Sequence, residues 1–154
     1  MNNEIGNASK EPDGFKVQFE SILHHDINTV WKAITNKDKM KQWYFDIPDF
    51  KLEVGHEFIW WAGPPNGKQW EHNGKIIEVI EKSKLVHSWS YQGYKGETVV
   101  FWELSKIDKN KTHLLFIHEI IIPFPEDEEA LKQENFVDGW NQIINTSLKE
   151  FLEK

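Results

Sequence analysis

Residues 136–153, FVDGWNQIINTSLKEFLE, form the stretch that decides the fold. At the turn angle of an α-helix, about 100° per residue, its apolar and polar side chains separate onto two opposite faces. The apolar face carries Phe136, Val137, Trp140, Ile143, Ile144, Leu148 and Phe151. The polar face carries Asp138, Asn141, Gln142, Asn145, Lys149 and Glu153. A helix with one wide apolar stripe must bury that stripe against a second layer.

The start of this helix is predicted near Pro125. Proline suits a first helical turn, and the acidic run 126–129 lies where the helix dipole favours negative charge. Within the helix, Gly139 costs about 1 kcal/mol relative to alanine. We therefore expect Gly139 and Trp140 to mark the place where the helix meets a cavity, through a close approach of the sheet or through a bend.

The second layer is a sheet built from the residues that precede the helix. Alternating apolar and polar side chains predict strands, and short links such as 63–67 (GPPNG) predict antiparallel hairpins. We expect a kink or bulge at Gly74, which leaves open which side of the sheet the neighbouring residues face. The predicted strands span residues 15–23, 50–54, 57–62, 69–80, 85–91, 97–106 and 112–122.

Two short helices are predicted after the first strand, over residues 26–34 and 36–43, where the apolar spacing changes to a helical one. Asp26 or Asn28 is expected to cap the first of them. The sequence thus predicts an α+β fold, with one long helix against a curved antiparallel sheet. We expect residues 15–154 to form a single domain and residues 1–14, which are polar, to form a disordered tail.

Composition excludes several classes of function. The chain has no cysteine, so thiolate nucleophiles and cysteine-type zinc sites are excluded. Its 18 basic residues are all lysines and its net charge is −7, which disfavours nucleic acid as a partner. No apolar run reaches the roughly 20 residues that span a bilayer, so no membrane insertion is expected. The cytoplasm is the expected compartment.

The aromatic content is high, with eight tryptophans, ten phenylalanines and three tyrosines in 154 residues. These rings either fill a small core or line a cavity for an apolar or aromatic guest, since ligand pockets are mostly apolar with a few polar groups. The sequence leaves both explanations open.

Several short motifs follow one another along the chain. They are 30–35 (VWKAIT) with Trp43, Val54-Gly55 before Phe58, 74–79 (GKIIEV), 85–89 (LVHSW), 112–118 (THLLFIH), and Gly139-Trp140 with Leu148 and 151–152 (FL). These motifs resemble those of the START-like (SRPBCC) superfamily, and in particular the homologues of the activator of heat-shock protein 90 ATPase. The resemblance extends from about residue 15 to residue 152. It implies the helix-grip fold, with about six or seven strands around the final helix.

The resemblance implies three functions. The first is binding of a small hydrophobic or aromatic ligand, a lipid included, in an internal cavity between the sheet and the C-terminal helix. The second is a stress-related co-chaperone that binds a chaperone partner, and the third is a cyclase- or aromatase-like enzyme with His118 or His87 transferring protons. No nucleophile motif, phosphate loop or suggestive carboxylate pair indicates catalysis, and no cofactor is implied. Residues 24–26 (HHD) are interpreted as a polar loop with a cap rather than a metal site.

The candidate ligand-binding residues are those whose strand or helix phase points them inward. His118 is expected to face the helix in phase with Phe116, while His87 shares a strand face with Trp89. Both of these strand faces are also typical of an ordinary aromatic core. Phe45 is expected to lie beside Trp43 at the mouth of the cavity. The candidates are Trp43, Phe58, Trp60, Trp70, His72, His87, Trp89, Tyr91, Trp102, Phe116, His118, Phe136, Trp140 and Ile144.

Overall fold

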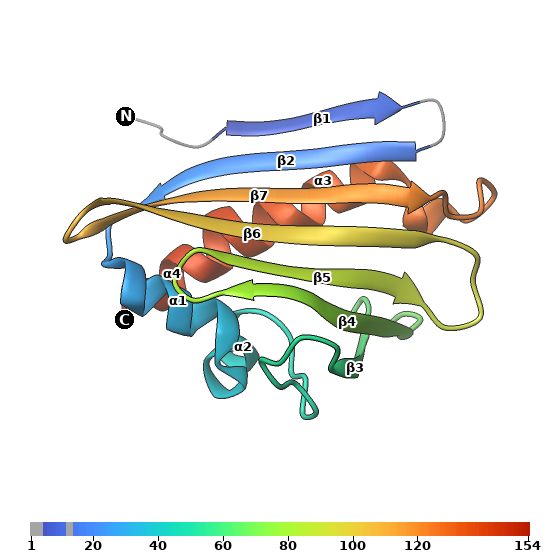
Figure 1. Cartoon of the computed structure of the whole chain (residues 1–154). Helices are drawn as coiled ribbons and strands as arrows, with labels where there is room; N and C mark the ends of the chain where they lie inside the picture. The colour runs from blue at the N-terminus through green and yellow to red at the C-terminus, as the bar shows by residue number, and fades with distance from the viewer. Residues whose placement is uncertain (1–4, 12–13) are drawn as a thin grey trace.

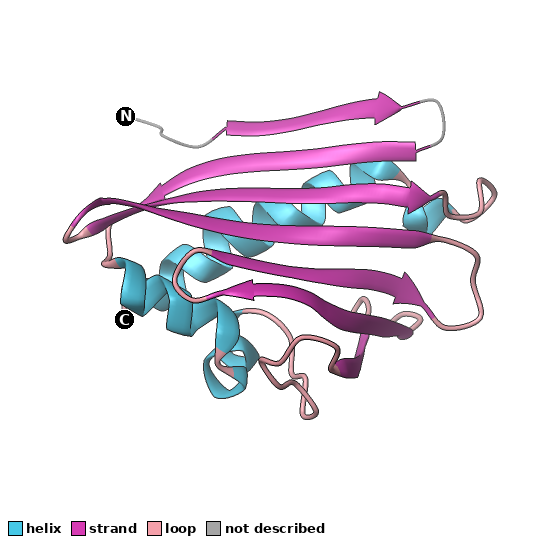
Figure 2. Cartoon of the chain, in the orientation of Figure 1, coloured by secondary structure: helices cyan, strands magenta, loops and turns pink. Residues whose placement is uncertain are grey.

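A curved antiparallel sheet of seven strands forms one layer of the molecule, in the order β1-β2-β7-β6-β5-β4-β3. The computed structural model describes residues 5–11 and 14–154. A long C-terminal helical segment runs along one face of the sheet, and two short helices lie near its β3–β4 side (Figures 1 and 2). The strands are β1 (Ile5–Glu11), β2 (Gly14–Leu23), β3 (Glu57–Ala62), β4 (Trp70–Ile80), β5 (Lys84–Tyr91), β6 (Glu97–Asp108) and β7 (Lys111–Ile122).

Inward-facing side chains stand opposite one another across neighbouring strands. His118 pairs with Val17 on one side and with Val100 on the other. The row continues from Val100 through His87 to Ile76. Every member of this row is at most 4% exposed. The prediction that the side chains of His118 and His87 point into the interior is therefore confirmed.

The C-terminal helical segment consists of α3 (Gln133–Gln142), a π-helical stretch (Ile143–Leu148) and α4 (Lys149–Leu152). Its buried residues recur at every fourth position. In an α-helix each such step overshoots a full turn by about 40°, so a long stripe drifts away from the sheet. The looser π-helical winding opposes that drift. The buried residues are Phe136, Trp140, Ile144, Leu148 and Leu152.

The predicted start of this helix near Pro125 is wrong, because α3 begins at Gln133 and is preceded by a 3₁₀ turn at Glu129–Leu131. Phe124 is 7% exposed, and its ring centroid lies 5.4 Å from that of Tyr91. Leu131 is buried as well. Anchoring these two side chains at the end of the sheet holds the intervening chain out of a helix. Among the described residues, no helix is long and apolar enough to cross a membrane.

The two short helices, α1 (Ile27–Thr35) and α2 (Lys37–Trp43), are confirmed, and both begin at side-chain caps. The Asp26 carboxylate accepts a hydrogen bond from the Thr29 backbone N–H at 3.2 Å. The Asn36 side-chain oxygen accepts from the backbone N–H groups of Asp38 and Lys39. Such caps satisfy amide donors that have no partner within the helix. Of the two caps considered for α1, Asp26 is the one used.

Two chain segments differ from the sequence-based expectation. Residues 50–54, predicted as a strand, form turns, in which the Phe50 N–H donates to the Ile47 carbonyl and the His56 N–H to the Glu53 carbonyl. Residues 5–11, expected to belong to a disordered tail, form edge strand β1 paired with β2. Pairing of backbone groups does not need apolar side chains, so composition is a poor guide there. Residues 1–4 and 12–13 of the expected tail lie outside the described residues.

Gly74 has a packing role rather than the expected bulge. The register of β4 against β5 shifts between Ile76 and Glu78 instead. A Cβ atom at Gly74 would lie 2.6 Å from the Phe58 ring, so the absence of a side chain lets that ring pack against the strand. His72 of the same strand faces inward and is 6% exposed.

Candidate functional site

The interior between the sheet and the C-terminal helix is filled with packed aromatic rings. The ring centroid of Trp89 lies 5.2 Å from those of both Trp60 and Trp140, in edge-on geometries. The Trp140 ring is also 4.3 Å from Phe116 and 6.0 Å from Trp102. These separations are those of direct aromatic contact. Of the two explanations for the aromatic content, core filling therefore holds for the centre of the molecule.

His118 lies in that core within a hydrogen-bonded chain. The Trp140 indole N–H donates to His118 Nδ1 at 3.0 Å, so the proton of the neutral imidazole is on Nε2. Nε2 lies 2.7 Å from the Thr98 hydroxyl, which donates to the Trp89 carbonyl at 2.6 Å. Burial, and secondarily the charge of nearby His87, lowers the pKa of His118 to about 3. The imidazole is thus held neutral in one tautomer within a network that includes groups of α3, β6 and β5.

His87 is held in the opposite tautomer. Its Nδ1–H donates to the Ser88 carbonyl at 3.0 Å, which leaves Nε2 to accept from the Trp102 indole N–H at 3.4 Å. Burial lowers the pKa of His87 to about 4. Both residues named for the enzymatic alternative are therefore neutral and enclosed in the core.

An open pocket of about 590 Å³ lies at one end of the sheet, beneath the first turns of α3. Its walls come from the chain after α2, the loop between β3 and β4, the facing ends of β4 and β5, and the turn that leads into α3. None of the lining side chains carries a formal charge at neutral pH. They are Phe45, Ala62, Gly63, Pro64, Trp70, His72, Tyr91, Ala130, Leu131, Asn135, Phe136 and Gly139.

Two lining residues supply polar atoms while remaining neutral. His72 Nδ1 donates to the Trp70 carbonyl at 2.9 Å, and burial lowers the pKa of His72 to about 4. The Tyr91 hydroxyl accepts from the Trp89 indole N–H at 2.9 Å, and burial raises the pKa of Tyr91. Because that hydroxyl accepts from Trp89, it keeps its own proton as a donor. The pocket thus combines apolar walls with a small number of neutral polar groups.

The candidate ligand-binding residues fall into three groups. Trp70, His72, Tyr91 and Phe136 line the open pocket. Trp43, Phe58, Trp60, His87 and Trp102 surround a small enclosed void. Trp89, Phe116, His118, Trp140 and Ile144 are buried and line neither space.

Several pocket residues were not among the candidates. Gly139 was expected to meet a cavity, and it lines the pocket. Of the two reasons proposed for a glycine there, a close approach of the sheet is not found. A Cβ atom at Gly139 would have no atom within 4 Å, so the sheet does not approach the helix closely at this point. Ala62 ends β3 in phase with Phe58 and Trp60, so strand alternation could have found it. The remaining residues lie in a loop, in a turn or at a helix start, where no periodicity marks a facing side: Gly63, Pro64, Ala130, Leu131 and Asn135.

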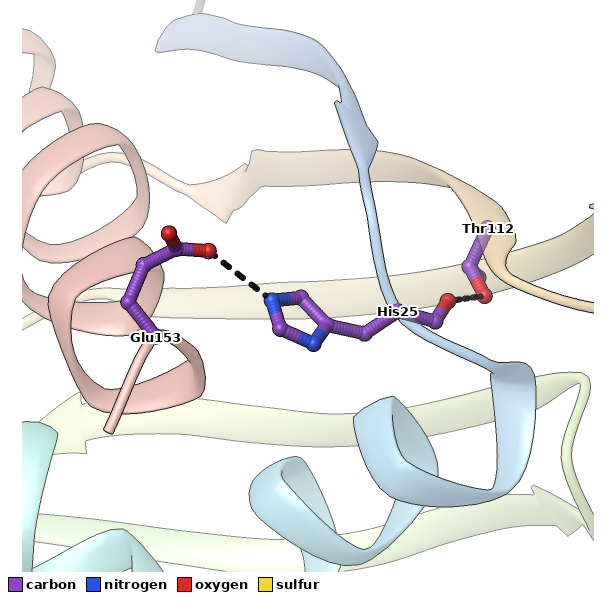
Figure 3. A network of polar contacts seen from close by, with 3 residues as sticks. All are labelled: His25, Thr112 and Glu153. Carbon is purple, nitrogen blue, oxygen red and sulfur yellow. Dashed lines mark hydrogen bonds and ion pairs between the residues drawn. The ribbon is translucent and has the colours of Figure 1, made fainter.

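His25 and Asp26, at the junction of β2 and α1, make contacts that connect elements of the fold. Asp26 caps α1, and His25 Nε2 lies 3.1 Å from a carboxylate oxygen of Glu153 in the last turn of the chain. The Thr112 hydroxyl at the start of β7 donates to the His25 carbonyl at 2.8 Å (Figure 3). This network ties the end of the C-terminal helix to β7 and α1. Within the described ranges no group of three or more His, Asp or Glu side chains could hold a metal ion.

Comparisons with known proteins agree with this geometry. The chain is similar to a solved protein from Arthrobacter aurescens, with a TM-score of 0.76 and 12% identity over 96% of this chain and 91% of that chain. For a protein from Chromobacterium violaceum the TM-score is 0.75, with 15% identity over 90% and 97% of the two chains. For CalU16 from Micromonospora echinospora it is 0.69, with 19% identity over 98% and 87%. No curated protein matches the chain.

At these identities the solved structures establish the fold alone, which is the expected helix-grip fold of START-like proteins. The family model described as "Activator of Hsp90 ATPase homolog 1-like protein" matches residues 24–153, which is most of the chain. The chain therefore belongs to the family of Activator of Hsp90 ATPase homolog 1-like proteins.

Proposed function

We propose that this protein binds a small, uncharged apolar or aromatic molecule in the open pocket between the sheet and α3. The observation that carries the proposal is a pocket of about 590 Å³ whose lining side chains are all uncharged. Small-molecule sites typically measure about 300–1,000 Å³ and have mostly apolar walls. A charged guest would lose its hydration without meeting an opposite charge, so a neutral guest is favoured.

The guest would contact aromatic and aliphatic faces and find few hydrogen-bonding groups. The rings of Trp70 and Phe136 offer flat apolar surfaces from the sheet and from the helix, respectively. The Tyr91 hydroxyl offers a proton, and His72 presents a neutral imidazole. Asn135 shapes the rim instead, because its side-chain amide donates to the Glu129 carbonyl at 2.8 Å. These groups would orient a guest but would not by themselves transform it.

The family description supports a second candidate, a co-chaperone that acts through a surface. The enzymatic candidate has less support, because His118 and His87 are enclosed and do not line the open pocket. Of the three histidines that face the interior, His72 is the one at the pocket wall. We propose the cytoplasm as the compartment. For the ligand we propose an apolar or aromatic molecule, without narrowing the class to lipids.

A titration followed by two-dimensional NMR tests the proposal, with a library of neutral apolar and aromatic molecules as probes. A hit should shift the amides of residues 62–64 and 130–139 and the indole signal of Trp70. Replacing Gly139 with leucine should abolish these shifts, because the new side chain enters open space at the pocket wall. Gln142→Leu, on the exposed side of the same helix, is the matched control and should bind like the wild type.

Two results would overturn the proposed function. One is a library screen in which no probe shifts the pocket signals of the wild-type protein. The other is a hit that binds the Gly139→Leu variant as tightly as the wild type, since the site would then lie elsewhere.

A further inference from the structure

A second, enclosed void lies deeper in the molecule, beyond the ring of Phe45, and has a volume of about 10 Å³. Among the residues with polar side chains at its wall are Tyr44 directly after α2, Trp60 of β3 and His87 of β5. The Phe45 ring, which lines the open pocket, lies 4.4 Å from the Tyr44 ring and 5.9 Å from the Trp60 ring.

Two polar atoms at this wall have no hydrogen-bond partner in the described part of the chain. They are the Tyr44 hydroxyl and the Trp60 indole nitrogen, and both are fully enclosed. Other indoles of the core do have protein acceptors: Trp43 donates to the Ala33 carbonyl at 2.9 Å and Trp140 to His118 at 3.0 Å. Buried polar groups in native proteins are nearly always paired, with protein or with ordered water.

His87 adds an acceptor to the same wall. Its Nδ1–H is used by the Ser88 carbonyl, so Nε2 presents a lone pair. The protein donor that reaches this nitrogen is the Trp102 indole N–H at 3.4 Å, beyond the usual range of such bonds. The residues that line the void thus include one with an unpaired N–H donor, one with an unpaired hydroxyl, and one with a weakly used acceptor.

We propose that this void is a hydration site for one water molecule, which accepts from the Trp60 indole N–H and bonds to the Tyr44 hydroxyl and His87 Nε2. A buried water needs a space of about one water-sized sphere, roughly 10–15 Å³, and typically makes about three hydrogen bonds. The volume of the void meets the first condition, and the Tyr44 hydroxyl, the Trp60 indole N–H and His87 Nε2 are the three partners proposed for the second. A void of this size bordered only by apolar atoms would stay dry, so the enclosed polar atoms are what select water.

The water would connect elements that the backbone leaves separate. β3 is an edge strand that pairs only with β4 among the described strands. A water held by Trp60, Tyr44 and His87 joins this edge strand to the end of α2 and to β5. It is thus a structural link across the β3 side of the core, and it does not depend on a guest in the open pocket.

The test is measurement of water–protein nuclear Overhauser effects at the assigned indole protons of the free protein. The Trp60 indole proton should show a cross-peak to water with the sign of a long-lived contact. The indole protons of Trp43 and Trp140 are internal controls and should show none, because their acceptors are protein atoms. The absence of a cross-peak at Trp60 would overturn the proposal.

A pair of variants tests the proposed partners. Tyr44→Phe keeps the ring but removes one of the three partners, and it should weaken the Trp60–water cross-peak at least twofold. Tyr94→Phe is the matched control: it removes a hydroxyl that bonds to Lys68 in the exposed chain, and it should leave the cross-peak unchanged. An unchanged cross-peak in Tyr44→Phe would show that the water is not held as proposed.

Discussion

Replacing Trp140 with alanine perturbs the contact between the C-terminal helix and the sheet at a buried aromatic residue. Trp140 is 2% exposed, and its ring centroid lies 4.3 Å from Phe116 of β7 and 5.2 Å from Trp89 of β5. Its indole N–H also donates to His118 Nδ1 at 3.0 Å. The substitution therefore removes ring packing and a buried hydrogen bond together.

The expected cost follows from these two contributions. Truncating a buried tryptophan to alanine in a tightly packed core costs about 3–5 kcal/mol. Removing the Trp140 donor from the buried His118 nitrogen adds about 1–3 kcal/mol. We expect the free energy of unfolding to fall by about 5 kcal/mol, a large part of the 5–15 kcal/mol typical of native proteins. If the ring bordered a pre-existing cavity, the loss would be clearly smaller, because fewer contacts would be broken.

Urea unfolding followed by far-ultraviolet circular dichroism measures the change, provided that the slope of the transition is unchanged. Trp140→Phe separates the two contributions, since it keeps most of the ring and loses the N–H, and it should cost about 1–3 kcal/mol. Trp61→Ala is the control: Trp61 is 63% exposed, and its loss should change stability by about 0.5 kcal/mol or less. A loss below about 1 kcal/mol for Trp140→Ala would refute the packed helix–sheet interface.

Three further predictions concern the buried histidines, a helix cap and the helix glycine. Burial lowers the pKa values of His72, His87 and His118 to about 4, 4 and 3, below the value of about 6.5 for an unfolded chain. Between these pH values the unfolded state binds more protons than the folded state. The free energy of unfolding should therefore decrease as the pH falls from about 6.5 to about 4, by up to about 1.4 kcal/mol per histidine and pH unit. Equal stability at pH 7 and pH 5 in urea titrations would contradict this prediction. Asp26→Ala should cost about 1 kcal/mol, seen as a lower melting temperature that Asp26→Asn largely restores, because the amide oxygen still caps α1. Gly139→Ala should raise the stability by up to about 1 kcal/mol, since the methyl group meets open space; a lower melting temperature would show crowding that the structure does not contain.

The predicted secondary structure was accurate where side-chain patterns report on two well-defined faces. β5, β6, β7 and both short helices lie within a few residues of their predicted ranges. The pattern misled at residues 50–54, where Phe50 is buried and Val54 is 66% exposed without a strand between them. It also misled at the start of the last helix: Phe124 is buried against Tyr91 of β5 and Phe136 of α3, and Leu131 is buried in the 3₁₀ turn, but neither belongs to the helix itself.

The candidate site was predicted only in part. Four of its residues line the open pocket: alternation along a strand places Trp70, His72 and Tyr91 on the inner face, and the helical stripe places Phe136 there. Alternation does not say how far along the strand the inner face is covered by other side chains. Trp89 is buried under Trp140, whereas Tyr91, two residues further along the same strand, reaches the pocket.

The sequence by itself determined the order of the elements from β2 onward, apart from the false strand at residues 50–54, and the apolar stripe of the last helix. These features depend on the local period of side chains, and the cap at Asp26 depends on residues at most three positions apart. They were enough to indicate an α+β fold with one long helix against an antiparallel sheet, and the resemblance of short motifs indicated the helix-grip fold and the family.

Only the tertiary structure decided whether the aromatic residues fill the interior or line a cavity. That outcome depends on how rings from distant segments interlock, such as Trp60 of β3 with Trp89 of β5 and Trp89 with Trp140 of α3. The open pocket arises for the same reason, where the loop at residues 62–64 and the turn at residues 130–131 come together without enough side-chain volume to close the space. Packing of this kind is set by shape in three dimensions, which no periodicity along the chain records.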